Sequence, residues 1–159
     1  RTIKEVNPDT TVEVLIPDFQ GRLDLVDQVV AAAPEIISHN METVRRISPQ
    51  VRSAAKYDVS LAVLSRIAEQ GATAKTGIMV GLGETPEEVC CLMDDVLAAG
   101  VSVLTIGQYL QPSRKNIQVT EYVTPEQFNV YKSIALKKGF RMVESAPLVR
   151  SSYHAEKHV

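Results

Sequence analysis

The sequence predicts an α/β protein built on a parallel sheet, either an open sheet or part of a barrel. Runs with high β-propensity alternate with segments in which apolar residues recur at helical spacing. Three helices are predicted to begin at a Ser-Pro or Thr-Pro pair, and three end at a glycine just before a strand. We count about five strands and four helices, joined by right-handed crossovers. That number is too small for a closed barrel of about eight strands.

The elements follow one another in a regular order. The predicted strands are residues 11–16, 35–38, 78–80, 101–106 and 140–143. The first predicted helix carries its apolar residues between Leu23 and Ala33. The second is a longer helix that starts at Ser48, has its apolar face on Tyr57, Leu61, Leu64 and Ala68, and ends at Gly71. The last two run to Gly100 and Gly139, with residues 113–123 predicted as a loop before the final helix.

Residues 74–88 combine a buried strand, a glycine turn and a helix start. Gly81 and Gly83 permit backbone angles that a side chain would block. Thr85 is placed as an N-cap, and Glu88 three residues later completes a capping box. In parallel α/β folds a strand that passes through glycines into a capped helix builds a site at the carboxyl edge of the sheet. A tight turn without a ligand remains the alternative.

Composition narrows the functional classes. The chain has 159 residues, which suits a single domain spanning 1–159. Its net charge of −2 gives no electrostatic reason to expect nucleic acid or an anionic membrane as a partner. No apolar run reaches the length of a membrane-spanning helix, and the first residues lack the apolar core of a signal peptide. Because the chain does not begin with Met, we expect a fragment or a processed chain. The adjacent Cys90 and Cys91 indicate neither disulfides nor a metal site and suit the cytoplasm.

Polar residues follow every predicted strand, at the edge where a small-molecule site is expected. Each also has a purely structural alternative, such as capping a segment or bonding loop backbone. His39 is a lone histidine that we interpret as structural. Glu84, inside the glycine turn, favours a nucleobase or ribose there over a phosphate. The full set is Asp18, His39, Asn40, Glu42, Gly81, Gly83, Glu84, Gln108, Tyr109, Gln111, Arg150, Ser151, Ser152, Tyr153 and His154.

Five motifs in order resemble the lipoyl synthase family, and the similarity covers essentially the whole chain. They are VEVLIPDFQG, HNMETV, TGIMVGLGET, LTIGQYLQPS and PLVRSSYHA. The resemblance implies a partial (βα) barrel of the radical S-adenosylmethionine (SAM) type, with outer helices around about five strands in this chain. It implies sulfur insertion at carbons 6 and 8 of an octanoyl group on a lysine of a lipoyl carrier domain, using SAM and two 4Fe–4S clusters.

The chain departs from the family in one respect. Neither cysteine motif that holds the family's clusters, CxxxCxxC or CxxxxCxxxxxC, occurs here. The chain therefore resembles the C-terminal half of a lipoyl synthase, and we expect it to be inactive alone and to bind no cofactor by itself.

The resemblance implies binding roles for individual residues of this chain. Asn40 and Glu42 resemble the pair that contacts the SAM ribose. Gly77, Gly81 and Glu84 resemble the pattern beside the adenine. Ser152, the second serine of RSSY, resembles a serine ligand of the auxiliary cluster. Gln108 and Tyr109 stay unassigned, and no catalytic residue is assigned.

Two other classes stay open at this stage. One is a different α/β-barrel enzyme that binds a phosphorylated metabolite at the glycine turn, and the other is a noncatalytic binding module. A barrel segment also exposes a sheet edge and an inner surface that we expect to be apolar. We therefore expect this chain to self-associate or to pack against a neighbouring chain.

Overall fold

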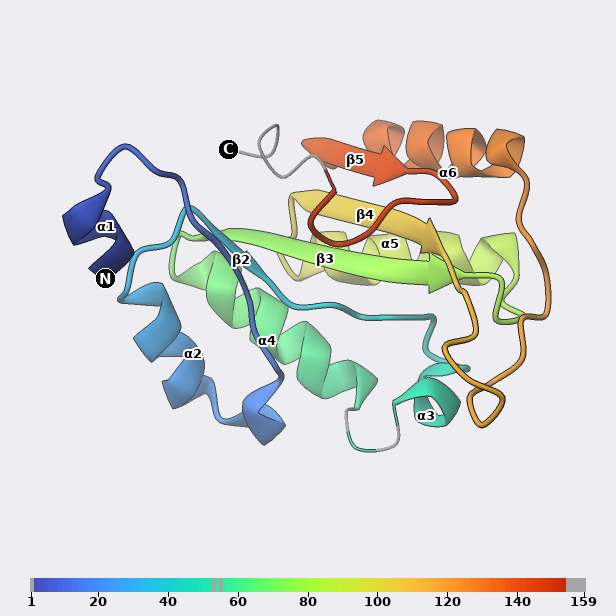
Figure 1. Cartoon of the computed structure of the whole chain (residues 1–159), viewed down its shortest axis with the longest axis horizontal. Coiled ribbons are helices and arrows are strands. Elements are labelled where there is room, and N and C mark those ends of the chain that lie inside the picture. Colours follow the sequence, from blue (N-terminus) through green and yellow to red (C-terminus); the bar gives the residue numbers. More distant parts are fainter. Residues whose placement is uncertain (1, 53, 55, 154–159) are drawn as a thin grey trace.

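Five parallel strands form a single sheet in the computed structural model, which describes residues 2–52, 54 and 56–153 (Figure 1). The strands are β1 (Glu13–Leu15), β2 (Ile36–Ser38), β3 (Thr73–Val80), β4 (Val103–Gln108) and β5 (Met142–Ser145). Each pairs in parallel with the next one along the chain, in the order β1-β2-β3-β4-β5. An uninterrupted order is that of a barrel segment, because the strand order of a doubly wound sheet reverses. The predicted fold class is confirmed.

Helices between the strands pack on the outer face of the sheet, whereas the first helix precedes β1 and has no buried residue. They are α1 (Thr2–Val6), η1 (Phe19–Gly21, a 3-10 turn), α2 (Leu23–Val30), α3 (Ser48–Val51), α4 (Tyr57–Glu69), α5 (Pro86–Ala98) and α6 (Pro125–Lys138). Helices α4, α5 and α6 lie behind the sheet in Figure 1. Two of the three predicted Ser/Thr-Pro starts are capped: the Thr85 hydroxyl accepts from Glu88 N in a complete capping box, and Thr124 accepts from Gln127 N. At the third, Ser48 is the first residue of α3, its N-cap is Ile47, and no side chain among the described residues caps the helix.

Several predicted boundaries differ from the structure, and one helix was not predicted. Strand β3 begins at Thr73 rather than at 78, β4 ends at Gln108 rather than at 106, and β1 is shorter than the predicted 11–16. The single helix from Ser48 to Gly71 is wrong, because α3 ends at Val51 and Arg52 leaves the helical region at φ −128° and ψ 80°. The last strand starts at Met142 rather than 140. Gly139 adopts φ 114° and Phe140 N donates to Ala135 O, so residue 140 still closes α6 in a Schellman arrangement. The short helix α1 has no counterpart among the predicted elements.

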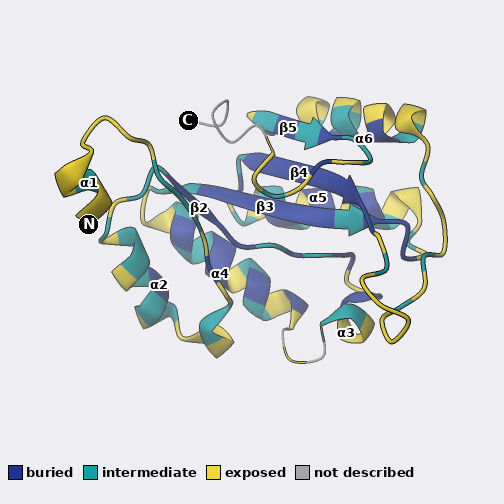
Figure 2. Cartoon of the chain, viewed as in Figure 1, coloured by how far each residue is buried: buried dark blue, intermediate teal, exposed yellow. Residues whose placement is uncertain are grey.

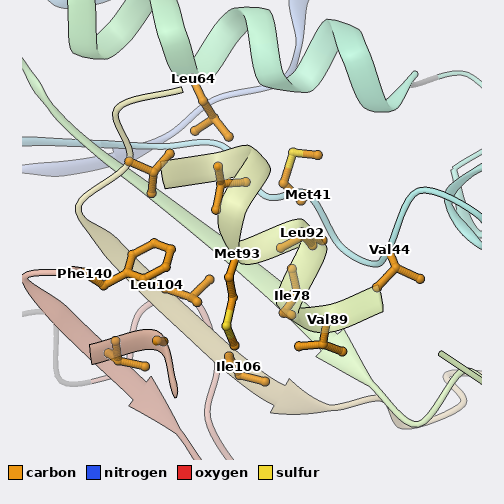
Figure 3. Close-up of a cluster of buried hydrophobic side chains, with 14 of the residues drawn as sticks. Met41, Val44, Leu64, Ile78, Val89, Leu92, Met93, Leu104, Ile106 and Phe140 are labelled. Carbon is orange, nitrogen blue, oxygen red and sulfur yellow. The ribbon is translucent and has the colours of Figure 1, made fainter. Parts of the chain in front are cut away.

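The hydrophobic core lies between the sheet and these helices. In Figure 2 the buried residues concentrate on β3, β4 and the helix faces turned toward them. Ile78, Leu104 and Ile106 of the strands belong to the same buried cluster as the α5 side chains, and Figure 3 shows them gathered around Met93. The outer face of the sheet therefore carries most of the apolar packing.

The opposite, inner face is only partly the apolar surface that we expected, because polar side chains lie there beside the apolar Ile36 and Val103. Lys75 is fully buried, and its Nζ lies 2.7 Å from Glu13 Oε1, while the Ser38 hydroxyl donates to the same oxygen at 2.8 Å. These three side chains tie β1, β2 and β3 together. Side chains alternate between the faces of a strand, so only every second residue of β3 packs against helices and the rest is free to be polar or small.

Candidate functional site

The carboxyl edge of the sheet carries a hollow of about 110 Å³ built from four neighbouring segments. Asn40 and Glu42, which follow β2, lie in it together with Gly77 of β3. Three of the predicted nucleoside-binding residues are therefore brought together. The rest of the lining comes from β3, β4 and the C-terminal segment: Ile78, Met79, Thr105, Gly107, Val149, Arg150 and Ser151.

A second hollow of about 350 Å³ adjoins the first. It shares Asn40 and Glu42 with the first hollow, and Arg52 and the end of β1 also line it. Asn40 and Glu42 therefore stand between two recesses at the same edge. An elongated ligand that occupies both recesses would contact these two side chains at its middle.

Asn40 and Glu42 are both held in unusual states. Asn40 Oδ1 is buried and has no hydrogen-bond partner among the described residues. Glu42 has φ 66°, a left-handed conformation that is uncommon for a residue with a side chain. Its backbone is bonded to β3 on both sides, with Glu42 N donating to Gly77 O at 3.1 Å and Met79 N donating to Glu42 O at 2.8 Å. An unpaired buried acceptor and local backbone strain are features that functional sites often contain.

Gly77 leaves space that any side chain would fill. A Cβ at this position would lie 2.7 Å from Thr105 Oγ1 and 3.0 Å from Asn40 Oδ1. Thr105 lies on β4 and is the residue that the sheet register pairs with Gly77. Glycine is thus the residue that keeps the floor of the smaller hollow open beside the unpaired oxygen of Asn40.

Glu84 organises the glycine turn from within. Its carboxylate accepts from Gly81 N at 2.5 Å and from Leu82 N at 2.9 Å. The backbone amides that a phosphate would need are therefore already bonded to a carboxylate, which argues against the phosphate-binding alternative. Gly81 and Glu84 are not among the lining residues of the smaller hollow, and their contact with an adenine stays a prediction.

Arg46 ties the segment after β2 to the glycine turn. It donates from Nη2 to Gly83 O at 2.8 Å and forms an ion pair with Glu88 at 2.7 Å. This guanidinium is the main reason that the pKa of Glu88 falls to about 2. These bonds link the segment that follows β2 to the glycine turn.

Gln108 and Tyr109 bond to loop backbone. Gln108 Nε2 donates to Glu121 O at 2.9 Å, and Gln108 Oε1 accepts from Val123 N at 2.9 Å. The Tyr109 hydroxyl donates to Ile117 O. Both side chains are buried, so the structural alternative for these two residues is confirmed and they hold residues 113–123 against the sheet.

The C-terminal segment crosses the inner face of β4, as the red trace in front of the sheet shows (Figure 1). A Cβ on Gly107 would lie 2.3 Å from Val149 O, and Gln108 N donates to Pro147 O at 3.2 Å. This crossing places Arg150 and Ser151 in the smaller hollow. Ser152 is exposed and does not line it, and His154 lies outside the described residues.

The described residues do not provide the ligand set of an iron–sulfur cluster. No group of three or more His, Cys, Asp or Glu side chains within the described part of the chain could hold a metal ion. The thiols of Cys90 and Cys91 are free and belong to α5, behind the sheet, whereas the segment that carries Ser152 crosses in front. Ser152 is thus a single oxygen ligand at most, and its predicted role needs cysteines from elsewhere.

His39 is a satisfied core residue, as predicted. Its Nδ1 lies 3.0 Å from Ile16 O, its Nε2 lies 2.9 Å from Ser60 Oγ, and its side chain is buried. Burial is the main cause that lowers the pKa of His39, and the nearby Arg52 lowers it further. The imidazole is therefore neutral in the folded state near neutral pH.

This burial predicts a pH dependence of stability. Below about pH 6.5, His39 of the unfolded chain binds a proton, whereas His39 of the folded chain stays neutral. The free energy of unfolding should therefore fall with decreasing pH by up to about 1.4 kcal/mol per pH unit. The fall continues until pH reaches the lowered pKa of the folded state. Urea unfolding at a series of pH values should show a shallower fall for His39→Gln than for the wild type. Parallel profiles would contradict the assignment.

Several site residues were not predicted from the sequence. Arg52, Thr105 and Gly107 line the hollows although none of them belongs to a family motif position that was assigned. Two of them could be found only from the strand register, which pairs Gly77 with Thr105 and Met79 with Gly107. Arg52 gave no signal, since it was assigned to the interior of a helix.

The whole chain matches curated lipoyl synthases. It is 84% identical over 159 residues to the lipoyl synthase of Parabacteroides distasonis, 71% identical to that of Bacteroides fragilis and 62% identical to that of Treponema denticola. The match covers all of this chain but only 57%, 55% and 55% of these relatives, so the chain spans little more than half of their length. The predicted resemblance is confirmed, and the match lies in a C-terminal part of the relatives. No protein-family model matches the chain.

Solved structures agree with the fold. One is a radical S-adenosylmethionine methyltransferase from Kitasatospora setae with cobalamin and a [4Fe-4S] cluster bound. It superposes with a TM-score of 0.50 at 17% identity, and the match covers 66% of this chain and 22% of that one. The HMG-CoA lyase of Brucella melitensis also gives a TM-score of 0.50, at 12% identity, over 88% of this chain and 57% of that one. Among the described residues, none of the helices has the length and apolarity needed to cross a membrane.

Proposed function

We propose that this chain is part of a lipoyl synthase and that it supplies the SAM-binding edge of the barrel. The observation that carries the proposal is the 84% identity to a lipoyl synthase along all 159 residues. The proposed reaction of the intact enzyme is sulfur insertion at carbons 6 and 8 of a protein-bound octanoyl group, which makes it a sulfurtransferase. SAM supplies the hydrogen-abstracting chemistry when it is bound.

The two hollows at the carboxyl edge fit a nucleoside. A ribose offers two hydroxyl donors, and the Glu42 carboxylate and the unpaired Asn40 Oδ1 are acceptors on two residues that line both recesses. Gly77 keeps the floor beside them open. We assign the adenine side of the site to Gly77, Gly81 and Glu84, with Glu84 holding the turn in shape rather than binding the base directly.

The partners and location of the intact enzyme follow from the same proposal. The substrate is an octanoylated lipoyl carrier domain, and the location is the cytoplasm, which suits the free thiols of Cys90 and Cys91. The clusters would be held by cysteines outside the residues described above, with the Ser152 hydroxyl as one further ligand. Strand β1 forms an open edge of the sheet and Leu15 on it is 59% exposed, which supports self-association of this chain when it stands alone.

Glu42→Ala in the full-length protein tests the nucleoside site. Losing a hydrogen bond to a charged acceptor costs about 1–3 kcal/mol, so the Kd for SAM measured by calorimetry should rise by about 5- to 150-fold. Asn40→Ala should act in the same direction and more weakly. Glu126→Ala is the matched control, because this exposed carboxylate lies in the first turn of α6. Unchanged affinity in both site variants would remove these residues from the SAM site.

A further inference from the structure

A continuous chain of hydrogen bonds runs beneath the residues that we assign to the ribose. Arg52 Nη1 donates to Ser60 Oγ at 2.9 Å, and His39 Nε2 lies 2.9 Å from the same hydroxyl. His39 Nδ1 lies 3.0 Å from Ile16 O. The chain therefore links the end of β1, the end of β2 and α4 to the residue at which α3 stops.

The direction of each bond in this chain is determined by chemistry. Ile16 O can only accept, so Nδ1 of the neutral imidazole carries the hydrogen and Nε2 must accept. Ser60 Oγ then donates to Nε2 and accepts from the guanidinium, which can only donate. Every bond is satisfied in one tautomer alone. A proton on Nε2 would remove the acceptor of the Ser60 hydroxyl.

The same guanidinium reaches the ribose-binding segment. Arg52 Nη1 also donates to Asn40 O at 3.1 Å. Asn40 carries the unpaired Oδ1, and Glu42 two residues later has the left-handed backbone. Arg52 and His39 line the larger hollow with these two residues. A strained segment keeps its conformation only when surrounding bonds hold it, and this bond adds to those that Glu42 makes with β3.

We propose that Arg52, Ser60 and His39 are positioning residues that fix Asn40 and Glu42 for contact with the nucleoside. The inference rests on the proposed function for the identity of the ligand, but it concerns residues that no motif assigned. Two charged groups act on the imidazole besides its burial: Arg52 disfavours its protonation and Asp18, beyond the end of β1, favours it. The neutral form is the one in which the chain is complete.

Ser60→Ala in the full-length protein is the primary test, with Ser65→Ala as its matched control. Both serines lie on α4, but the Ser65 hydroxyl donates to Glu69 of the same helix. Calorimetry with SAM near pH 7.5 should show an affinity about tenfold lower for Ser60→Ala and an unchanged affinity for Ser65→Ala. Arg52→Ala should show a similar loss, and Arg52→Lys should recover part of it, because an ammonium group can still donate to Asn40 O.

The pH profile separates positioning from mere stability. Because the pKa of folded His39 lies below its ordinary value of about 6.5, SAM affinity of the wild type should decline only as pH falls below that value. His39→Gln, which can still accept from Ser60 but cannot take a proton, should flatten that decline. Each variant is checked by circular dichroism at the titration temperature, so that only folded protein is compared. A lowered melting temperature with unchanged SAM affinity and an unchanged pH profile would overturn the proposal.

The Glu42→Ala variant distinguishes the two possible failures. If Glu42→Ala binds SAM as the wild type does, the nucleoside site itself is misassigned. If Glu42→Ala loses affinity while Ser60→Ala and Arg52→Ala both retain it, and His39→Gln leaves the pH profile unchanged, the site is correct and the positioning chain is refuted. Loss of affinity in Glu42→Ala, Ser60→Ala and Arg52→Ala, with partial recovery in Arg52→Lys, is the expected result.

Discussion

Gly81→Ala is expected to destabilise the fold by about 4 kcal/mol, the sum of left-handed backbone strain and a steric clash. Gly81 has φ 97°, and a Cβ there would lie 2.3 Å from Gln108 Nε2 and 2.4 Å from Glu121 O. The second contact is with backbone, which cannot rotate away. Gly81 O also accepts from Thr120 N at 2.9 Å, so the loop is bonded to the residue that would push it outward.

Gly139→Ala is the matched control for this prediction. Gly139 has φ 114°, but nothing lies within 4 Å of a Cβ placed on it. Its substitution should therefore cost only the backbone strain, about 1–2 kcal/mol. Urea unfolding monitored by circular dichroism gives both values. If Gly81→Ala is no less stable than Gly139→Ala, residues 120–123 are free to move and the bonds of Gln108 do not fix them.

Local sequence rules predicted the elements whose boundaries depend on local chemistry. The capping box at Thr85 and the glycine that ends α6 are both determined by residues within one helical turn, and both were predicted correctly. The start of β5 was missed by two residues because the Phe140 N–H is used to close the preceding helix. Pairing with β4 begins only at Met142, which is a property of the sheet and not of the segment.

Long-range contacts decided what the sequence could not. At the break between α3 and α4, the side chain of Arg52 bonds to Asn40 O and Ser60 Oγ, residues that are 12 and 8 positions away in the sequence. Helical propensity gives no indication of such a break. The buried Lys75 was likewise hidden, since its partner Glu13 lies 62 positions away in the sequence. The motif residues Asn40, Glu42 and Gly77 were predicted because their family resemblance is local, whereas their neighbours Thr105 and Gly107 required the strand register.

Gly107→Ala is expected to displace the C-terminal segment and to lower lipoyl formation by the full-length protein by about a hundredfold, the scale for misplacing site residues by about 1 Å. The new Cβ would meet Val149 O at 2.3 Å, so the backbone that crosses β4 must move. Val149 is buried and is followed by Arg150 and Ser151 of the smaller hollow and by Ser152.

Hydrogen exchange followed by mass spectrometry provides the structural readout. Gln108 N is bonded to Pro147 O and Val149 N to Ala146 O, and both amides should exchange faster in Gly107→Ala. Leu148→Ala is the control, because this side chain is 76% exposed and its loss leaves the crossing in place. Ser152→Ala should reduce lipoyl formation without changing the exchange, and Ser151→Ala should have a milder effect. Normal lipoyl formation and normal exchange in Gly107→Ala would show that the position of this segment does not matter to the site.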